Sequence, residues 1–280
     1  MLNPGSMDTQ AAPQIREHYE LEKTLAARLR TASKEERRRL YPALYDELFR
    51  RLPRHPTLAQ ESSPEAIRRE VGRQLALLGR FLSPETVCLE IGPGSCALAL
   101  AVAERVRHVY GAEVSAELTS QARLPANFTL LATDGSSLDL PAATVNVVYS
   151  NQLMEHLHPD DAVDQLQHIY RVLTPGGRYV CVTPNRLSGP WDVSRHFDRV
   201  ATGFHLHEYT VGELESLLRA AGFRRIDAYV GARGHYVRVP IRLISGCERA
   251  LMALPEAVSW RVAHSPPVRV LLGMRLVALK

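Results

Sequence analysis

The feature that most constrains the fold is an alternation of short apolar runs with helical segments, which begins at Val87. Strands that alternate with helices form a parallel sheet, because a parallel pair needs a crossover connection that packs on the sheet. We therefore predict an α/β fold with a seven-stranded, mostly parallel sheet and helices on both faces. The expected strands are 87–91, 109–112, 128–132, 145–150, 179–183, 225–230 and 275–279.

The first third of the chain is predicted to be helical. Two helices are expected over 15–52, where leucines and tyrosines recur at helical spacing and Ser33 with Glu36 has capping-box spacing. A third is expected over 64–82, and the arginine run 37–39 is typical of a solvated helix face. The predicted organisation is an expression remnant over 1–6, an N-terminal helical cap or lid over 7–83, a core over 84–235 with an insertion at 185–208, and a C-terminal helical extension with the last strand over 236–280.

Composition excludes several classes of protein. The longest uninterrupted apolar run, 96–103, is far shorter than the ~20 residues of a membrane helix, so no membrane span is expected. The four cysteines are widely separated without zinc-site spacing, so we expect no metal site and a reducing, cytoplasmic location. The net charge of +4 conceals an acidic middle between basic ends.

The strongest motif is LEIGPGSCALALA, residues 89–101, in which a strand ends in an acid and continues through two glycines into a helix. Gly92 and Gly94 permit unusual backbone angles and close approach of a ligand, so a nucleotide-type site is predicted. A nicotinamide fingerprint also fits Gly92, Gly94 and Ala97. Glu90 argues against it, because a carboxylate there repels a pyrophosphate and suits a ligand with an ammonium group.

This loop resembles the first motif of the class I S-adenosylmethionine-dependent methyltransferases, with Cys96 where a third glycine is usual. The resemblance continues in order through HVYGAEVS, LLATDGSSLDLP, VNVVYSNQLMEHL and RVLTPGGRYVCVTPN, over 87–184. It implies a Rossmann-like fold, S-adenosylmethionine as cofactor, and methyl transfer to an oxygen, nitrogen or carbon atom of a small-molecule acceptor. A metabolite, a sugar or a natural product is the expected kind of acceptor.

The resemblance also implies roles for single residues. Glu113 would accept hydrogen bonds from the ribose hydroxyls, and Asp134 would bind the adenine amino group beside the N–H of Gly135. Tyr19, in a lid-like segment, would close over the sulfonium end. The expected cofactor-binding residues are Tyr19, Glu90, Gly92, Gly94, Glu113, Asp134, Gly135 and Asn151.

Three histidines are candidates for catalysis. His156 follows the fourth strand, in the loop that faces the transferred methyl group in this family, and a histidine can accept a proton at neutral pH. His196 and His207 lie in the insertion, where His205 is a further histidine. For each of these histidines, the simpler interpretation is a solvated or loop-bracing side chain.

Three alternatives to a small-molecule methyltransferase stay open. The basic ends favour an RNA methyltransferase, although the loop SNQLMEH differs from the N/D-P-P-Y/F of amino-directed nucleic-acid enzymes, so a nucleic-acid partner is not expected. The second is a pseudoenzyme that binds the cofactor and acts as an interaction module, and the third is a nicotinamide oxidoreductase. The expected partners are a small-molecule methyl acceptor and, as a further possibility, a second copy of the chain in a homodimer.

Overall fold

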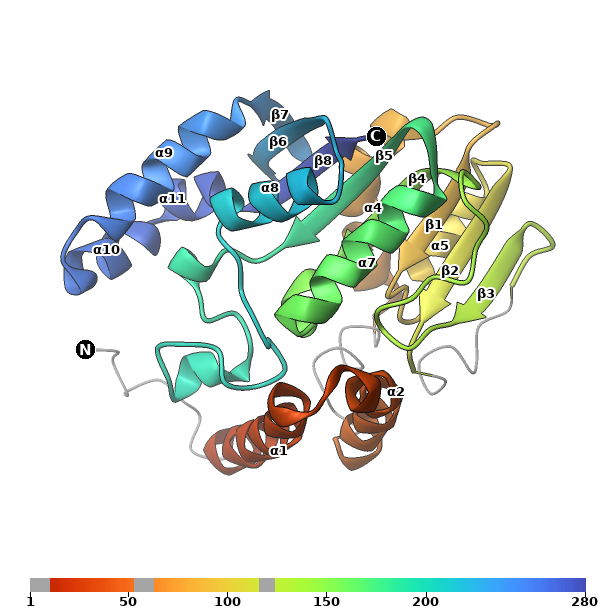
Figure 1. Cartoon of the computed structure of the whole chain (residues 1–280). Helices are drawn as coiled ribbons and strands as arrows, with labels where there is room; N and C mark the ends of the chain where they lie inside the picture. Colours follow the sequence, from red (N-terminus) through yellow and green to blue (C-terminus); the bar gives the residue numbers. More distant parts are fainter. Residues whose placement is uncertain (1–10, 53–62, 116–123) are drawn as a thin grey trace.

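The computed structural model describes residues 11–52, 63–115 and 124–280, and an eight-stranded sheet forms its centre (Figure 1). The strands are β1 (Val87–Ile91), β2 (His108–Glu113), β3 (Phe128–Ala132), β4 (Val145–Asn151), β5 (Leu173–Thr183), β6 (Arg225–Ala232), β7 (His235–Val239) and β8 (Met274–Leu279). Their order is β3-β2-β1-β4-β5-β8-β6-β7. The pairs from β3 to β5 are parallel and the others are antiparallel, so the predicted mostly parallel, Rossmann-like α/β class is confirmed.

The predicted count of seven strands is wrong, because a hairpin adds β7 at one edge of the sheet. Arg233 and Gly234 connect β6 to β7 with φ angles of 55° and 87°. Two successive residues at positive φ form the tight turn whose twist matches a hairpin. Asparagine or aspartate usually precedes the glycine of such a turn, so the Arg-Gly pair gave no clear turn signal.

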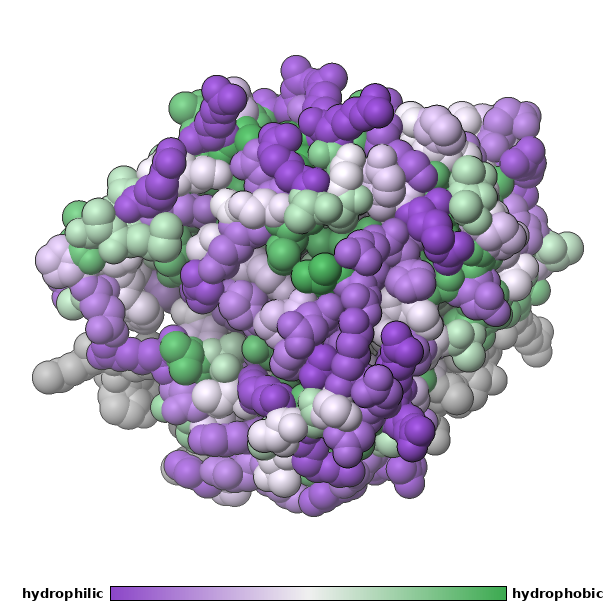
Figure 2. All heavy atoms as spheres, viewed as in Figure 1, coloured by the Kyte–Doolittle hydropathy of each residue, from purple (hydrophilic) through white to green (hydrophobic). Residues whose placement is uncertain are grey.

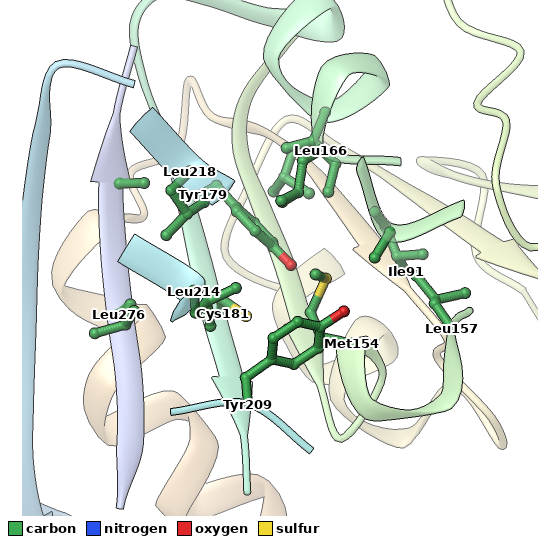
Figure 3. Packing of buried hydrophobic residues seen from close by; sticks show 14 of the residues in the cluster. Ile91, Met154, Leu157, Leu166, Tyr179, Cys181, Tyr209, Leu214, Leu218 and Leu276 are labelled. Carbon is green, nitrogen blue, oxygen red and sulfur yellow. The ribbon is translucent and has the colours of Figure 1, made fainter. Parts of the chain in front are cut away.

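Helices cover both faces of the sheet. One face carries α4 (Pro64–Leu78) and α5 (Ala97–Ala103). The opposite face carries α7 (Pro159–Val172), α8 (Val211–Ala220) and α9 (Ile241–Met252). Figure 3 shows Leu166 of α7 and Leu218 of α8 packed with Tyr179 of β5 in this second core.

The C-terminal helices form an extension beyond the sheet. α10 (Glu256–Ala263) and α11 (Pro266–Leu271) follow α9 and lead back into β8. Apolar side chains are exposed on and next to α10, and Figure 2 shows them at that end of an otherwise largely hydrophilic face. No helix within the three described ranges is long and apolar enough to cross a membrane.

Two of the three predicted N-terminal helices cover the carboxyl ends of the parallel strands: α1 (Ala11–Thr31) and α2 (Lys34–Arg51) (Figure 1). The predicted capping box of Ser33 and Glu36 is confirmed. α4 differs from the expectation of a cap, because its buried Leu77 and Leu78 pack in the core between helix and sheet. Ser62, which with Glu65 has capping-box spacing in the sequence, lies outside the described residues.

The arginine run 37–39 is expected on a solvated helix face, but Arg37 is only 3% exposed. Its guanidinium donates to both carboxylate oxygens of Asp161 in α7, at 2.6 and 2.9 Å. The Tyr41 hydroxyl donates to the same carboxylate at 2.8 Å. This buried cluster fastens α2 to the body of the domain.

Candidate active site

The candidate site lies at the carboxyl ends of β1, β2 and β4. From β1 the sheet extends through β2 and β3 to one side and through β4 and β5 to the other, so the strand order reverses at β1. Open α/β sheets bind ligands at this position. Glu90 of β1 and Glu113 of β2 project from the same face of the sheet, because Glu90 is paired with Gly111 and side chains alternate along a strand. Two acids predicted to bind one cofactor are therefore brought together by the parallel register.

The loop after β1 is shaped by three residues at positive φ. Gly92, Gly94 and Cys96 have φ angles of 71°, 53° and 65°. The left-handed angle of Cys96 explains why a third glycine is usual there, since a side chain in this region costs roughly 1–2 kcal/mol. The Cys96 side chain is fully buried in the core under α5, and this burial offsets the backbone cost.

Glu113 is held at the end of β2 by backbone hydrogen bonds. One carboxylate oxygen accepts from the N–H groups of Val114 and Ser115, at 2.8 and 3.1 Å. The other accepts from the N–H of Gly94 at 3.0 Å. Burial raises the pKa of Glu113, and the three backbone donors oppose that rise. The acid is fixed between the glycine loop and the second strand.

Glu90 is the least satisfied acid of the site. It is 7% exposed, and its Oε2 has no hydrogen-bond partner among the described residues. Burial, followed by the charge of Glu113, raises the pKa of Glu90 to about 8. Glu90 is therefore largely protonated at neutral pH and suits a cationic ligand that would make it ionise.

Replacing Glu90 by glutamine is expected to stabilise the unliganded protein by about 1–3 kcal/mol at pH 8.5. Because the pKa of Glu90 is raised, its contribution to stability is complete below about pH 4.5 and is lost as the pH rises through about 8. Urea unfolding at pH 5 and pH 8.5 measures the change, which should grow with pH. Glu85→Gln, at an exposed position before β1, should stay within about 0.5 kcal/mol. The same pH dependence in Glu90→Gln and the parent protein would contradict the assignment.

Asp134 and Gly135 form a tight turn after β3. Asp134 Oδ1 accepts from the N–H and hydroxyl groups of Ser136 and Ser137, and Oδ2 lies 3.5 Å from Arg38 Nε. Burial acts to raise the pKa of Asp134, but these hydrogen bonds together lower it. Gly135 has a φ of 89°, and a Cβ there would lie 3.0 Å from the Tyr41 ring, so only glycine fits beneath α2.

Glu155, His156 and His205 form a second cluster of titratable side chains, in which Glu155 and His205 are buried and His156 is half-buried. Their potential ligand atoms all lie within 4.8 Å of one another, so the residue types and spacing could hold a metal ion or transfer a proton. Glu155 accepts from Thr183 Oγ1 at 2.7 Å, and burial raises its pKa to about 7. His205 Nδ1 lies 2.6 Å from Glu208; burial lowers the pKa of His205, but Glu208 and Glu155 outweigh that and raise it.

Comparison with known proteins decides the family. Residues 88–177 match the family model described as "Methyltransferase domain". A Mycolicibacterium smegmatis protein named "probable S-adenosylmethionine-dependent methyltransferase" is 38% identical over 92 residues, 33% of this chain and 34% of the relative. A Mycobacterium tuberculosis protein of the same description is 38% identical over 88 residues, 31% of this chain and 30% of the relative. Residues 88–177 therefore carry a class I S-adenosylmethionine-dependent methyltransferase domain.

The chain aligns with only about a third of the length of these curated relatives. Solved structures share the fold over a longer stretch. A Haloferax volcanii methyltransferase, in complex with the Trm112 methyltransferase activator, has a TM-score of 0.57 and 18% identity over 84% of this chain and 97% of its own. A phosphoethanolamine N-methyltransferase of Haemonchus contortus, with phosphoethanolamine and S-adenosylhomocysteine, has a TM-score of 0.57 and 14% identity over 89% of this chain and 50% of its own.

The three predicted histidines have different surroundings. His156 belongs to the cluster with Glu155 and His205, and its Nδ1 lies 3.1 Å from the Phe204 carbonyl. His196 lies beside Arg195, and His207 packs on Tyr209 with ring centroids 4.6 Å apart. His205 joins the cluster instead, and the sequence did not single it out.

Tyr19 and Asn151 lie in different surroundings from each other. The Tyr19 ring stacks on Phe197 at 4.4 Å and its hydroxyl donates to Asp198 at 2.6 Å, so Tyr19 anchors α1 to the insertion. Asn151, at the end of β4, lines a cavity on the α4 face of the sheet. Their predicted roles in cofactor binding stay predictions.

Tyr45 of α2 was missed by the sequence reasoning. Its ring lies edge-on to His156, with centroids 6.1 Å apart, and tilted against Phe204 at 4.9 Å. Burial raises the pKa of Tyr45 well above its usual value, and the charges of Glu155 and Glu113 add to the rise. Tyr45 therefore places the aromatic face of α2 against His156 and the insertion. A tyrosine on an amphipathic helix carries no signal of this position.

Proposed function

We propose that this protein transfers the methyl group of S-adenosylmethionine to an oxygen, nitrogen or carbon atom of a small-molecule acceptor. The main support is that Glu90, Gly92, Gly94 and Glu113 lie together at the carboxyl ends of β1 and β2, where the strand order of the sheet reverses. The unpartnered Glu90 oxygen fits the cofactor's ammonium group. Glu113, which its backbone donors orient, suits the two ribose hydroxyls, and Asp134 suits the adenine amino group.

When bound, the cofactor supplies an activated methyl group on a positively charged sulfur. The protein's own contribution is to orient the reactants and to exclude water. Tyr45 and the rest of α2 cover the site, and His156 is the group proposed to accept a proton from the acceptor. If the acceptor needs no deprotonation, orientation alone carries the reaction.

Hydrogen bonds between the N-terminal cap and the insertion support a small acceptor. Arg30 of α1 donates to the carbonyl groups of Thr202, Gly203 and His205, at 2.8 to 3.1 Å. The backbone N–H of Phe204 donates to Glu22 of α1 at 3.2 Å. These bonds hold the cap and the insertion together. The insertion includes the turns Arg186–Ser188 and Val193–His196. We place the protein in the cytoplasm, because three of its cysteines are buried free thiols.

Replacing Glu113 by alanine is expected to weaken S-adenosylhomocysteine binding by about 1–3 kcal/mol, because two hydroxyls lose a charged acceptor. Titration calorimetry measures the affinity, which for the parent protein should be micromolar, about −8 kcal/mol. Asp139→Ala is the control, because Asp139 is an exposed acid between β3 and β4. This variant should bind S-adenosylhomocysteine as the parent protein does. Binding of NAD without a response to either sulfur nucleoside would overturn the proposed function. Unchanged affinity in Glu113→Ala would remove that residue from the site.

A further inference from the structure

A second feature of the carboxyl edge is a cavity of about 600 Å³ on the α4 face of the sheet. Its walls come from α4, the ends of β4 and β5, the β6–β7 hairpin, α11 and the start of β8. Four of the residues that line it are arginines, and Glu70 is the one acid in the described lining. We call it the arginine pocket, after Arg73, Arg233, Arg269 and Arg275.

Arg275 is the most firmly built of these groups. Its guanidinium lies over the ring of Tyr236, 5.1 Å from the centroid. A Cβ at Gly273 would lie 2.6 Å from Arg275 Nη1, so the glycine makes room for the guanidinium. Nη1 is buried and has no hydrogen-bond partner among the described residues. A buried guanidinium nitrogen without an acceptor is a binding group that an oxyanion would satisfy.

The remaining arginines extend the positive charge around the pocket. Arg269 lies over the Trp191 ring, 4.8 Å from the centroid, so its planar group is oriented by the insertion. Arg73 pairs with Glu70 at 3.2 Å in an exposed ion pair, which leaves it accessible to a stronger anionic partner. Arg73 and Arg233 also line a shallower hollow that Arg69 joins.

The arginine pocket adjoins the candidate active site through β4. Asn151 and Gln152, which begin the loop that faces the acceptor, line the pocket together with Tyr149. Burial raises the pKa of Tyr149, the charge of Glu90 raises it further, and the charge of Arg275 lowers it. Tyr149 therefore lies within reach of both charges, on the sheet face that also carries Glu90. A ligand in the pocket lies next to the ammonium end of the proposed cofactor site.

We propose that the arginine pocket binds an oxyanion of the methyl acceptor, a phosphate or a carboxylate, and so selects acceptors with negative charge. This inference rests on the proposed methyl transfer. Arginine forks bind phosphate and carboxylate through paired hydrogen bonds. The carboxylate of the cofactor's methionine is the other source of the same chemistry, but the volume of the pocket suits a whole small molecule.

The first test measures binding of inorganic phosphate by titration calorimetry. Arg275→Gln should weaken phosphate binding at least 5-fold and change S-adenosylhomocysteine affinity less than 2-fold. Arg73→Gln should also weaken phosphate binding, and it keeps the proposal testable if Arg275→Gln does not fold. Arg242→Gln, an exposed arginine on α9, is the matched control. Unchanged phosphate binding in both pocket variants would overturn the proposal. So would a loss of S-adenosylhomocysteine affinity of 10-fold or more in Arg275→Gln, since the pocket would then hold the cofactor's carboxylate.

The second test concerns the acceptor. Labelled S-adenosylmethionine is offered with pairs of amines and alcohols whose members differ only in a phosphate or carboxylate group. The parent protein should methylate the anionic member at least 10-fold faster, and Arg275→Gln should lose that preference. Equal rates, or faster methylation of the neutral member, would overturn the proposal. If the parent protein binds phosphate but not S-adenosylhomocysteine, the proposed function fails while the anion site stands.

Discussion

Replacing Arg37 by alanine is expected to lower the free energy of unfolding by about 3–5 kcal/mol, the largest effect that we predict for a single side chain. The change would leave the carboxylate of Asp161 buried, with a side chain 1% exposed, and without its charged partner. Truncating one member of a buried ion pair costs more than the pair contributes, because the remaining charge stays away from water. Urea unfolding measures the loss.

Two variants separate this effect from a general loss of helix α2. Arg39→Ala removes an exposed arginine from the same helix and should change stability by less than about 0.5 kcal/mol. Arg37→Met combined with Asp161→Leu removes both charges and should recover much of the loss, since an apolar pair can replace a buried ion pair. A loss below about 1 kcal/mol in Arg37→Ala would show that the ion pair does not hold the cap.

Replacing His156 by alanine is expected to lower turnover by about 100-fold or more while S-adenosylhomocysteine affinity stays unchanged. The reason is its position beside Glu155 and His205 and against the ring of Tyr45, which belongs to the helix that covers the carboxyl ends of the parallel strands (Figure 1). Turnover at saturating substrate measures the effect, and titration calorimetry checks the affinity. His156→Gln distinguishes a base from a brace, because glutamine can keep a hydrogen bond but cannot accept the proton.

The control for His156 is the same substitution at the two other predicted histidines. His196→Ala and His207→Ala should keep most of the turnover, since neither belongs to the cluster with Glu155 and His205. Parent-level turnover in His156→Ala would remove this residue as the base. Recovery of turnover in His156→Gln, with a loss of thermal stability in His156→Ala, would assign it to bracing the loop.

Much of the fold and the cofactor part of the site could be predicted because their causes are local in sequence. β1, the glycine loop and α5 follow one another within one short segment. The hydrophobic periodicity and the turn residues of this segment can be read from the sequence alone. Parallel strands bring their carboxyl ends to one edge, so strand-final acids such as Glu90 and Glu113 are expected together. The same reasoning did not reach β7, whose Arg-Gly turn lacks the usual residues.

The sequence by itself therefore determined the α/β class, the glycine loop and the two strand-final acids, because short-range periodicity and backbone requirements specify them. Only the tertiary structure decided that Arg37 is buried while Arg38 and Arg39 are not, and that His205 rather than His207 joins His156. It also decided that Arg275 has an unpaired nitrogen in a pocket beside the site. Each of these features depends on a partner that is distant in the sequence, as the burial of Arg37 depends on Asp161. Such long-range contacts cannot be predicted from the residue types alone.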